Sequence, residues 1–152
     1  MNWVDFLDEQ NVRKQLSTLN PGSEAVFGKM NAQQMVEHLS AVTQIANGNW
    51  KVDIFVSDDK AARRMPFLNT ENELQSGFKA SFLAEDPNEL KFDSIEEAID
   101  DLINQVAFFV KVFTDDKNRS IVHPFFGTLD FEYWKKFQVK HFTHHFKQFN
   151  LL

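Results

Sequence analysis

The sequence predicts an all-α fold, namely a four-helix bundle with one long crossover between the second and third helices. Three observations support this prediction: apolar residues recur at helical spacing in four segments, capping residues precede those segments, and about 45 residues separate the second helix from the third. Antiparallel neighbours in a bundle need only about 2–8 linking residues, so this long connection indicates two helices that run in the same direction. We expect residues 1–152 to form a single domain.

The first helix is expected near the N-terminus. Asp8 is a suitable N-cap for it, and Asn20-Pro21-Gly22 ends it. Its apolar face consists of Val12, Leu16 and Leu19. Within the crossover, Ser57 can cap a second short helix that Pro66 stops, so we expect the crossover to contain a helix of its own.

The second main helix begins with the pattern of a capping box, in which Asn31 is followed three residues later by Gln34. Apolar residues and one histidine then recur at helical spacing, and Asn47-Gly48 predicts the C-terminal end. The residues of this face are Met35, His38, Val42 and Ile45.

The third and fourth main helices are long. Ser94 opens the third in another capping-box pattern, Ser94-Ile95-Glu96-Glu97. Asp130 is the expected N-cap of the fourth, which should run to about Phe149. The third helix is expected to bury one stripe, made of Ile95, Ala98, Ile99, Leu102, Val106, Phe109, Val110 and Phe113.

The composition excludes several classes of function. The chain has 152 residues, 17 of them Phe, and no Cys, which excludes disulfides, iron–sulfur clusters, thiolate zinc sites and a cysteine nucleophile. A net charge of −6 argues against nucleic-acid binding, because such binding depends on neutralising phosphates. The sequence contains neither a Gly-rich phosphate loop nor a Gly-x-Ser-x-Gly motif. Any metal ion must therefore bind to His, Asp or Glu.

No segment of the sequence has the pattern of a transmembrane helix, because no run of about 18 apolar residues occurs. The first residues, Met1-Asn2-Trp3-Val4-Asp5, lack the basic and apolar regions of a signal peptide. We therefore expect a cytoplasmic protein that has no membrane partner.

Three of the five histidines fall where a helical bundle would bury them. His141 and His145 are four residues apart on the fourth helix, so their Cβ atoms lie about 5–6 Å apart on one face, a geometry in which two imidazoles can share a metal ion. His38 is surrounded by apolar residues on the second helix. The stripe that carries the histidine pair also contains Trp134, Gln138 and Gln148. A divalent cation would satisfy three buried imidazole nitrogens at once, so this convergence predicts a three-histidine metal site.

A purely structural interpretation of these histidines is the alternative. A single buried histidine is commonly satisfied by a carbonyl or a water, and helical histidine pairs also arise by chance. If a metal ion is bound, we expect zinc or nickel first and iron or manganese next, although imidazole sites also accept copper.

The remaining candidates lie close to this pattern. His144 could replace a ligand only if the helix were rotated by roughly 60°, so we expect a packed or semi-exposed histidine. His123 precedes Pro124 and is expected to be extended; it either lines the mouth of a pocket that holds the cofactor or stabilises a loop. Gln148 follows His145 by one turn, where it either contacts a ligand or bound water or fills the end of the bundle.

The fourth helix has a second apolar stripe. Because it lies on a different side from the histidines, we expect either the crossover or a partner subunit in a homodimer to cover it. Lys136, Lys140 and Lys147 occupy the remaining side, which predicts a solvated face. The stripe is made of Phe131, Phe142, Phe146 and Phe149.

Two blocks of the chain resemble the DinB-like superfamily, and most closely a bacterial branch of it known only as a domain of unknown function. The first block is residues 27–38, FGKMNAQQMVEH. The second starts at residues 123–127, HPFFG, and continues through Trp134 to residues 140–149, KHFTHHFKQF. Residues 49–93 show little resemblance.

This resemblance implies a four-helix bundle with a long crossover, often dimeric through helix faces. It also implies a divalent metal held by one histidine of the second helix and two of the fourth, which here correspond to His38, His141 and His145. Superfamily members of known activity are similar to thiol S-transferases that use bacillithiol, mycothiol or glutathione, including maleylpyruvate isomerases. The resemblance therefore implies a small-molecule substrate and a low-molecular-weight thiol partner.

These observations lead to three hypotheses about function. The first is a metal-dependent enzyme, in which a cation on neutral ligands lowers the pKa of a bound thiol or water for S-transfer, isomerisation or hydrolysis. The second is a non-catalytic dimeric module that binds a metal or a small ligand. The third is a bundle whose histidines are only stacked in the core.

Overall fold

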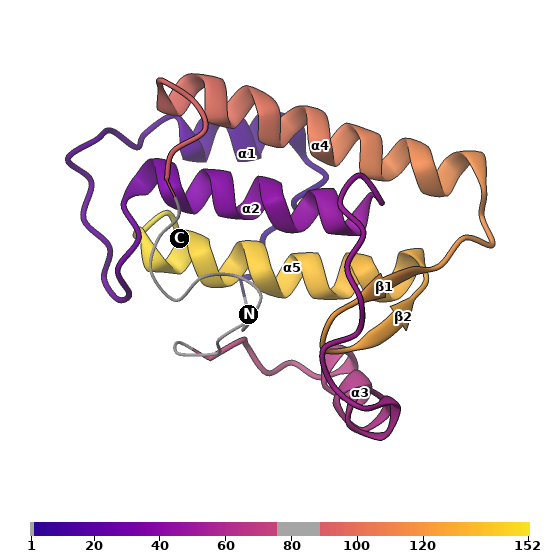
Figure 1. Cartoon of the computed structure of the whole chain (residues 1–152). Helices are drawn as coiled ribbons and strands as arrows, with labels where there is room; N and C mark the ends of the chain where they lie inside the picture. The colour runs from indigo at the N-terminus through magenta and orange to yellow at the C-terminus, as the bar shows by residue number, and fades with distance from the viewer. Residues whose placement is uncertain (1, 76–88) are drawn as a thin grey trace.

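The computed structural model describes residues 2–75 and 89–152. Within these ranges it contains five α-helices, one short 3-10 helix and a two-stranded antiparallel sheet (Figure 1). The elements in chain order are α1 (Glu9–Leu16), α2 (Ala32–Ala46), α3 (Asp58–Arg64), η1 (Met65–Asn69), α4 (Ile95–Asp115), β1 (Ile121–His123), β2 (Gly127–Leu129) and α5 (Phe131–Gln148). The 49–93 crossover includes residues 76–88, which lie outside the described residues.

The predicted all-α four-helix bundle is wrong, because the chain forms a mixed fold with a small sheet. β1 and β2 pair in an antiparallel register that places Ile121 opposite Leu129 and His123 opposite Gly127. Each strand has only three residues, which is too short for an alternating pattern to show in the sequence. At Gly127 the backbone has a φ of +84°, a conformation that favours glycine and starts β2 after the turn.

The predicted start of α1 and both predicted ends of α2 are confirmed, but α1 ends at Leu16, so the prediction that it continues through Leu19 is wrong. The Asp8 side chain accepts a hydrogen bond from a backbone N–H in the first turn of α1. At the start of α2, Asn31 and Gln34 form the reciprocal capping box, with both hydrogen bonds at 2.8 Å. Asn47 is the C-cap of this helix, and Gly48 follows it with a φ of +84°.

The three longest helices lie beside one another. Helix α2 packs against both α4 and α5, and Figure 1 shows α2 and α4 running in the same direction and α5 in the opposite one. Ser94 and Asp130 cap α4 and α5, as predicted. Nearly all of the predicted α4 stripe is buried, but Val110 is 37% exposed, so its predicted burial is wrong. Among the described residues, no helix combines the length and the apolar character needed to cross a bilayer.

The Phe stripe of α5 is buried by other parts of the same chain. Phe6 of the N-terminal segment stacks on Phe142 with ring centroids 5.3 Å apart. Phe109 and Phe113 of α4 lie 5.4 and 5.5 Å from Phe131. The rings that contact Phe131 and Phe142 therefore come from α4 and the N-terminal segment and not from the crossover, and the expected homodimer stays a prediction.

The prediction that the three α5 lysines form a solvated face is wrong for Lys140, which is only 3% exposed. Its ammonium group donates to the carbonyl oxygens of Thr70, at 2.7 Å, and Asn72. It also lies 4.7 Å from the ring centroid of Phe67 and 5.0 Å from that of Trp3. Burial lowers the pKa of Lys140. The lysine attaches the segment after η1 to α5.

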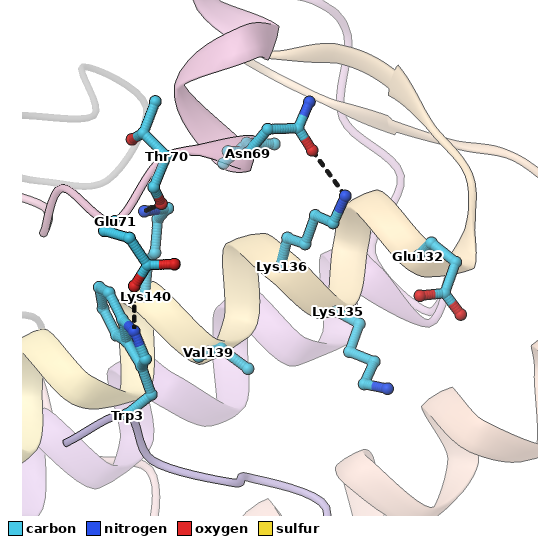
Figure 2. A pocket seen from close by; sticks show the side chains of 10 residues that line it. Trp3, Asn69, Thr70, Glu71, Glu132, Lys135, Lys136, Val139 and Lys140 are labelled. Atoms are coloured by element: carbon cyan, nitrogen blue, oxygen red, sulfur yellow. Dashed lines mark hydrogen bonds between the residues drawn. The ribbon is translucent and has the colours of Figure 1, made fainter. Parts of the chain in front are cut away.

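Two further contacts hold η1 and the segment after it to α5. Lys136 donates to Asn69 at 2.6 Å, and Figure 2 shows this bond at the edge of a groove of roughly 350 Å³. Lys147 forms an ion pair with Glu73 at 2.6 Å. Residues 69–73 of the crossover are thus fixed to α5 by polar contacts.

Candidate metal centre

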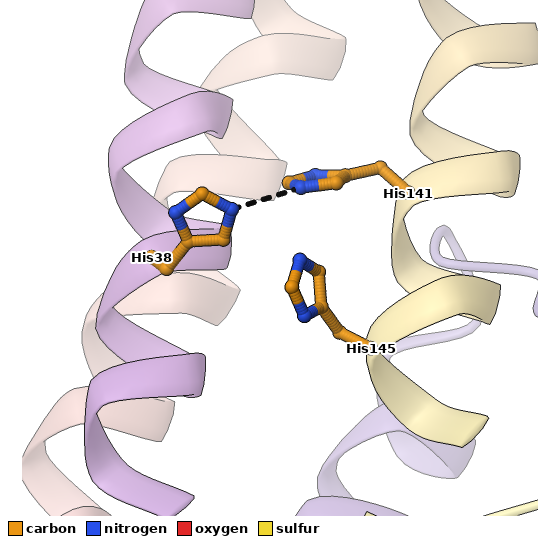
Figure 3. A group of neighbouring side chains, drawn as sticks. All are labelled: His38, His141 and His145. Atoms are coloured by element: carbon orange, nitrogen blue, oxygen red, sulfur yellow. Dashed lines mark hydrogen bonds between the residues drawn. The ribbon is translucent and has the colours of Figure 1, made fainter. Parts of the chain in front are cut away.

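His38, His141 and His145 lie together between α2 and α5 (Figure 3). One ring nitrogen from each residue lies within 4.8 Å of those from the other two. The Nε2 atoms of His38 and His141 are 3.0 Å apart. Ring centroids in the group are 4.7 to 5.0 Å apart. We call these three residues the histidine triad.

The packing of the two helices positions the triad. His141 and His145 occupy one face of α5, as their spacing of four residues requires. The ring of Phe137 stacks on that of His141 with centroids 5.3 Å apart and an interplanar angle of 19°. His38 lies on α2, the helix that the capping box starts. The triad therefore depends on contact between two helices that are about 100 residues apart in the sequence.

The triad is electrically neutral at pH 7. His141 and His145 are 6% and 5% exposed, and His38 is partly buried. Burial lowers the pKa of His38 to about 4, with a smaller contribution from the positive charge of His144. Burial and the neighbouring histidines lower the pKa values of His141 and His145 well below 6.5. A neutral imidazole has a free lone pair, which is the form that ligates a metal.

The triad geometry is compatible with a metal site. In a tetrahedral zinc site with bonds of about 2.0–2.1 Å, two ligand nitrogens lie about 3.3 Å apart. The Nε2 atoms of His38 and His141 are 3.0 Å apart, close to this value. A hydrogen bond between the two neutral rings has the same length. A search of the described residues for three or more His, Asp or Glu side chains close enough to share one ion finds the triad. The identity of such an ion is not fixed by three imidazoles.

Gln148 orients one ring of the triad. Its Oε1 lies 2.7 Å from Nδ1 of His145, and its Nε2 donates to the carbonyl of Phe27 at 3.0 Å. Because an amide oxygen only accepts, Nδ1 of His145 carries the hydrogen and Nε2 has the lone pair. The sequence placed Gln148 one turn from His145 but did not reveal Gly28, where a Cβ atom would lie 2.7 Å from Gln148 Nε2. The only sequence signal for Gly28 is its position in the 27–38 block.

The structure does not bring His123 into the triad. This histidine ends β1 and is 4% exposed, and its ring lies 4.3 Å from that of Phe137. Its Nδ1 accepts from the backbone N–H groups of Phe125, at 3.1 Å, and Phe126, at 3.3 Å. Burial lowers its pKa to about 3. These contacts stabilise the turn between the strands, and a contact of His123 with a cofactor stays a prediction.

His144 is partly buried beside the triad, as expected for a packed or semi-exposed histidine. Its Nδ1 lies 3.2 Å from the carbonyl oxygen of Leu74, and its ring centroid is 5.1 Å from that of Phe27. Together with Glu73 and Lys147 these residues line a small cavity of roughly 200 Å³. His144 is not among the three potential ligands.

Comparison with known proteins identifies a family but no characterised relative. No curated protein and no solved structure matches the chain significantly. None of the comparisons places it in the DinB-like superfamily. A family described as "Protein of unknown function (DUF1569)" matches residues 2–151, which is nearly the whole chain, and the chain therefore belongs to this family.

Proposed function

We propose that the protein binds one divalent transition-metal ion through the Nε2 atoms of His38, His141 and His145. The observation that carries this proposal is the convergence of three neutral, largely buried imidazoles, with two Nε2 atoms 3.0 Å apart. Imidazole nitrogens suit zinc, nickel, iron and copper, and we expect zinc or nickel first. The orientation of His145 by Gln148 supports the assignment, because metal-bound histidines usually donate their second ring N–H to an acceptor.

We further propose that the metal serves catalysis on a small molecule. Three neutral ligands leave the positive charge of the ion uncompensated, and such an ion lowers the pKa of a thiol or water beside it. The chain contains no Cys, so a thiol would have to be an external low-molecular-weight compound. The sequence resemblance to the DinB-like superfamily, whose members of known activity are similar to thiol S-transferases, suggests S-transfer or isomerisation as the first reactions to test.

The residues around the triad would have two tasks in such a reaction. His38 is the most exposed of the three ligands, so a small molecule would approach from its side. Phe137 and the buried face of α5 would exclude water from the opposite side, which strengthens electrostatic interactions at the centre.

A non-catalytic metal- or ligand-binding protein is the second candidate function. The observation that favours it is that the triad consists of histidines alone, without a carboxylate that could act as a general base. In that case the metal would stabilise the contact between α2 and α5 and would not activate a substrate.

Elemental analysis of protein purified without an affinity tag tests the metal assignment. We expect one metal ion per chain in the wild type, none in His141→Ala, and full occupancy in the control His144→Ala, whose ring lies outside the triad. Full occupancy in folded His141→Ala would show that the ligand assignment is wrong.

A second experiment separates the enzyme from the binding protein. Metal-replete protein is screened for transfer with bacillithiol, mycothiol and glutathione and a panel of electrophiles. Turnover that disappears in His141→Ala supports the enzyme, and consistent inactivity of metal-replete protein supports the binding protein.

A further inference from the structure

Two buried polar atoms on α5 have no hydrogen-bonding partner within the described ranges, namely Gln138 Oε1 and His141 Nδ1. The Gln138 residue is fully buried, and His141 is 6% exposed. The two residues are three positions apart, so they are neighbours on one side of the helix. An unpaired buried polar group destabilises the folded state, and a buried water that bridges the two atoms would satisfy both.

The hydrogen bonds of Gln138 fix the orientation of its amide. Gln138 Nε2 lies 2.9 Å from Thr43 Oγ1 on α2. The Thr43 hydroxyl donates its single hydrogen to the carbonyl of Leu39, at 2.8 Å. Because the hydroxyl has no second hydrogen, it must accept from Gln138, and the group facing it must be the amide NH₂. The unpaired atom of Gln138 is therefore an oxygen, which is an acceptor.

The unpaired atom of His141 is the complementary donor when the ring is in its ligating tautomer. Nε2 of His141 is the atom that lies 3.0 Å from Nε2 of His38 and faces the triad. If Nε2 has the lone pair of the neutral ring, Nδ1 carries the hydrogen. His145 already shows this arrangement, with its Nδ1 2.7 Å from the Oε1 of Gln148. The two α5 histidines of the triad thus each have a glutamine three positions away.

We propose that Gln138 is the positioning residue of His141. The two atoms are not hydrogen-bonded directly, so Gln138 Oε1 accepts from Nδ1–H of His141 through one buried water and holds the ring with the Nε2 lone pair toward the triad. Thr43 in turn holds the amide, so the α2 backbone fixes the tautomer of a ring on α5. The tautomer itself does not depend on a metal, whereas the effect on metal affinity rests on the proposed function.

The tautomer is measured first, on metal-free protein, by ¹⁵N-edited NMR of the imidazole nitrogens. In the wild type we expect His141 to carry its hydrogen on Nδ1. Gln138→Leu and Gln138→Met remove the acceptor and should shift His141 toward the Nε2–H form, while Gln138→Glu keeps an oxygen acceptor and should restore Nδ1–H. The matched control is Gln148→Leu, which should change the tautomer of His145 and leave that of His141 unchanged.

Affinity for Ni²⁺ provides the second readout. We expect Gln138→Leu to bind Ni²⁺ about 10–100-fold more weakly than the wild type and Gln138→Glu to retain most of the affinity. A His141 tautomer that stays unchanged in a folded acceptor-free variant, either Leu or Met, overturns the proposal. If the wild type binds no Ni²⁺ but the His141 tautomer still changes when the acceptor at position 138 is removed, the positioning role holds and the proposed function fails. If the wild type binds Ni²⁺ and the His141 tautomer is the same in the wild type and in the acceptor-free variants, only the positioning role fails.

Discussion

Gln148 Oε1 lies 2.7 Å from Nδ1 of His145, and the same amide donates through Nε2 to the carbonyl of Phe27 at 3.0 Å. This amide joins one ring of the triad to the loop that precedes α2. The loop can come this close because it has a glycine at position 28, where a Cβ atom would lie 2.7 Å from Gln148 Nε2. The orientation of His145 therefore depends on a residue that is far from it in the sequence.

Gly28→Ala is expected to damage the triad through Gln148. The new Cβ atom would overlap the amide, and the φ of +80° at this position is unfavourable for alanine. We expect a loss of about 1–3 kcal/mol in the free energy of unfolding, measured by urea denaturation, together with weaker Ni²⁺ binding. Gly22→Ala is the control, because its Cβ would lie 3.2 Å from the Asn20 side chain, away from Gln148. Equal effects of both substitutions would contradict this account.

Metal addition should stabilise the wild type and not the triad variants. A ligand that binds only the folded state at 100 times its dissociation constant adds about 2.7 kcal/mol to the free energy of unfolding. We expect Zn²⁺ or Ni²⁺ to raise the melting temperature of the wild type and of His144→Ala, and to leave His38→Ala and His145→Ala unchanged. Differential scanning calorimetry with and without a chelator measures the shift. An undiminished shift in His38→Ala would exclude that residue as a ligand.

Burial of His123 should make the protein less stable in acid. Its pKa is about 3 in the folded chain and about 6.5 when unfolded, so below pH 6.5 the unfolded state binds the extra proton. The contribution of the neutral His123 ring to the free energy of unfolding is complete above pH 6.5 and is lost as the pH falls toward 3. At pH 4.5 the titration of His123 alone lowers the free energy of unfolding by about 2–3 kcal/mol relative to its value at neutral pH. His123→Asn offers an amide oxygen to the same N–H groups without titrating, so its free energy of unfolding should fall less steeply between pH 6.5 and 4.5. Identical pH slopes would contradict a buried neutral His123.

The sequence was sufficient wherever the signal is local. Asn31 with Gln34, Ser94 and Asp130 each mark a helix start by their own backbone hydrogen bonds, and the structure has helices at all three. The pairing of His141 with His145 follows in the same way from helical geometry. The approach of His38 was predicted from the convergence of three histidines on apolar helix faces, because buried imidazoles need partners, and the sequence resemblance implied the same ligand.

Features that depend on distant segments could not be predicted. The β-hairpin has three-residue strands, and its stability depends on contacts such as Trp134 Nε1 donating to the Ile121 carbonyl at 2.9 Å. Lys140 seemed solvated because its buried state depends on the segment after η1, which the sequence does not place on α5. Val110 lies at the margin of the α4 stripe, where a small helical rotation decides exposure.

Lys140→Met should loosen the crossover without affecting the metal centre. The substitution keeps the apolar length of the side chain but removes the bonds to the Thr70 and Asn72 carbonyls and the contacts with two aromatic rings. Hydrogen bonds from a charged group contribute about 1.5–3 kcal/mol each in favourable cases, so we expect the free energy of unfolding to fall by about 1–3 kcal/mol. Limited proteolysis near residues 70–75 should accelerate, while Ni²⁺ affinity stays constant. Lys135→Met is the control, because Figure 2 shows its side chain directed away from Thr70. Equal proteolysis of the two variants would show that Lys140 does not hold this segment.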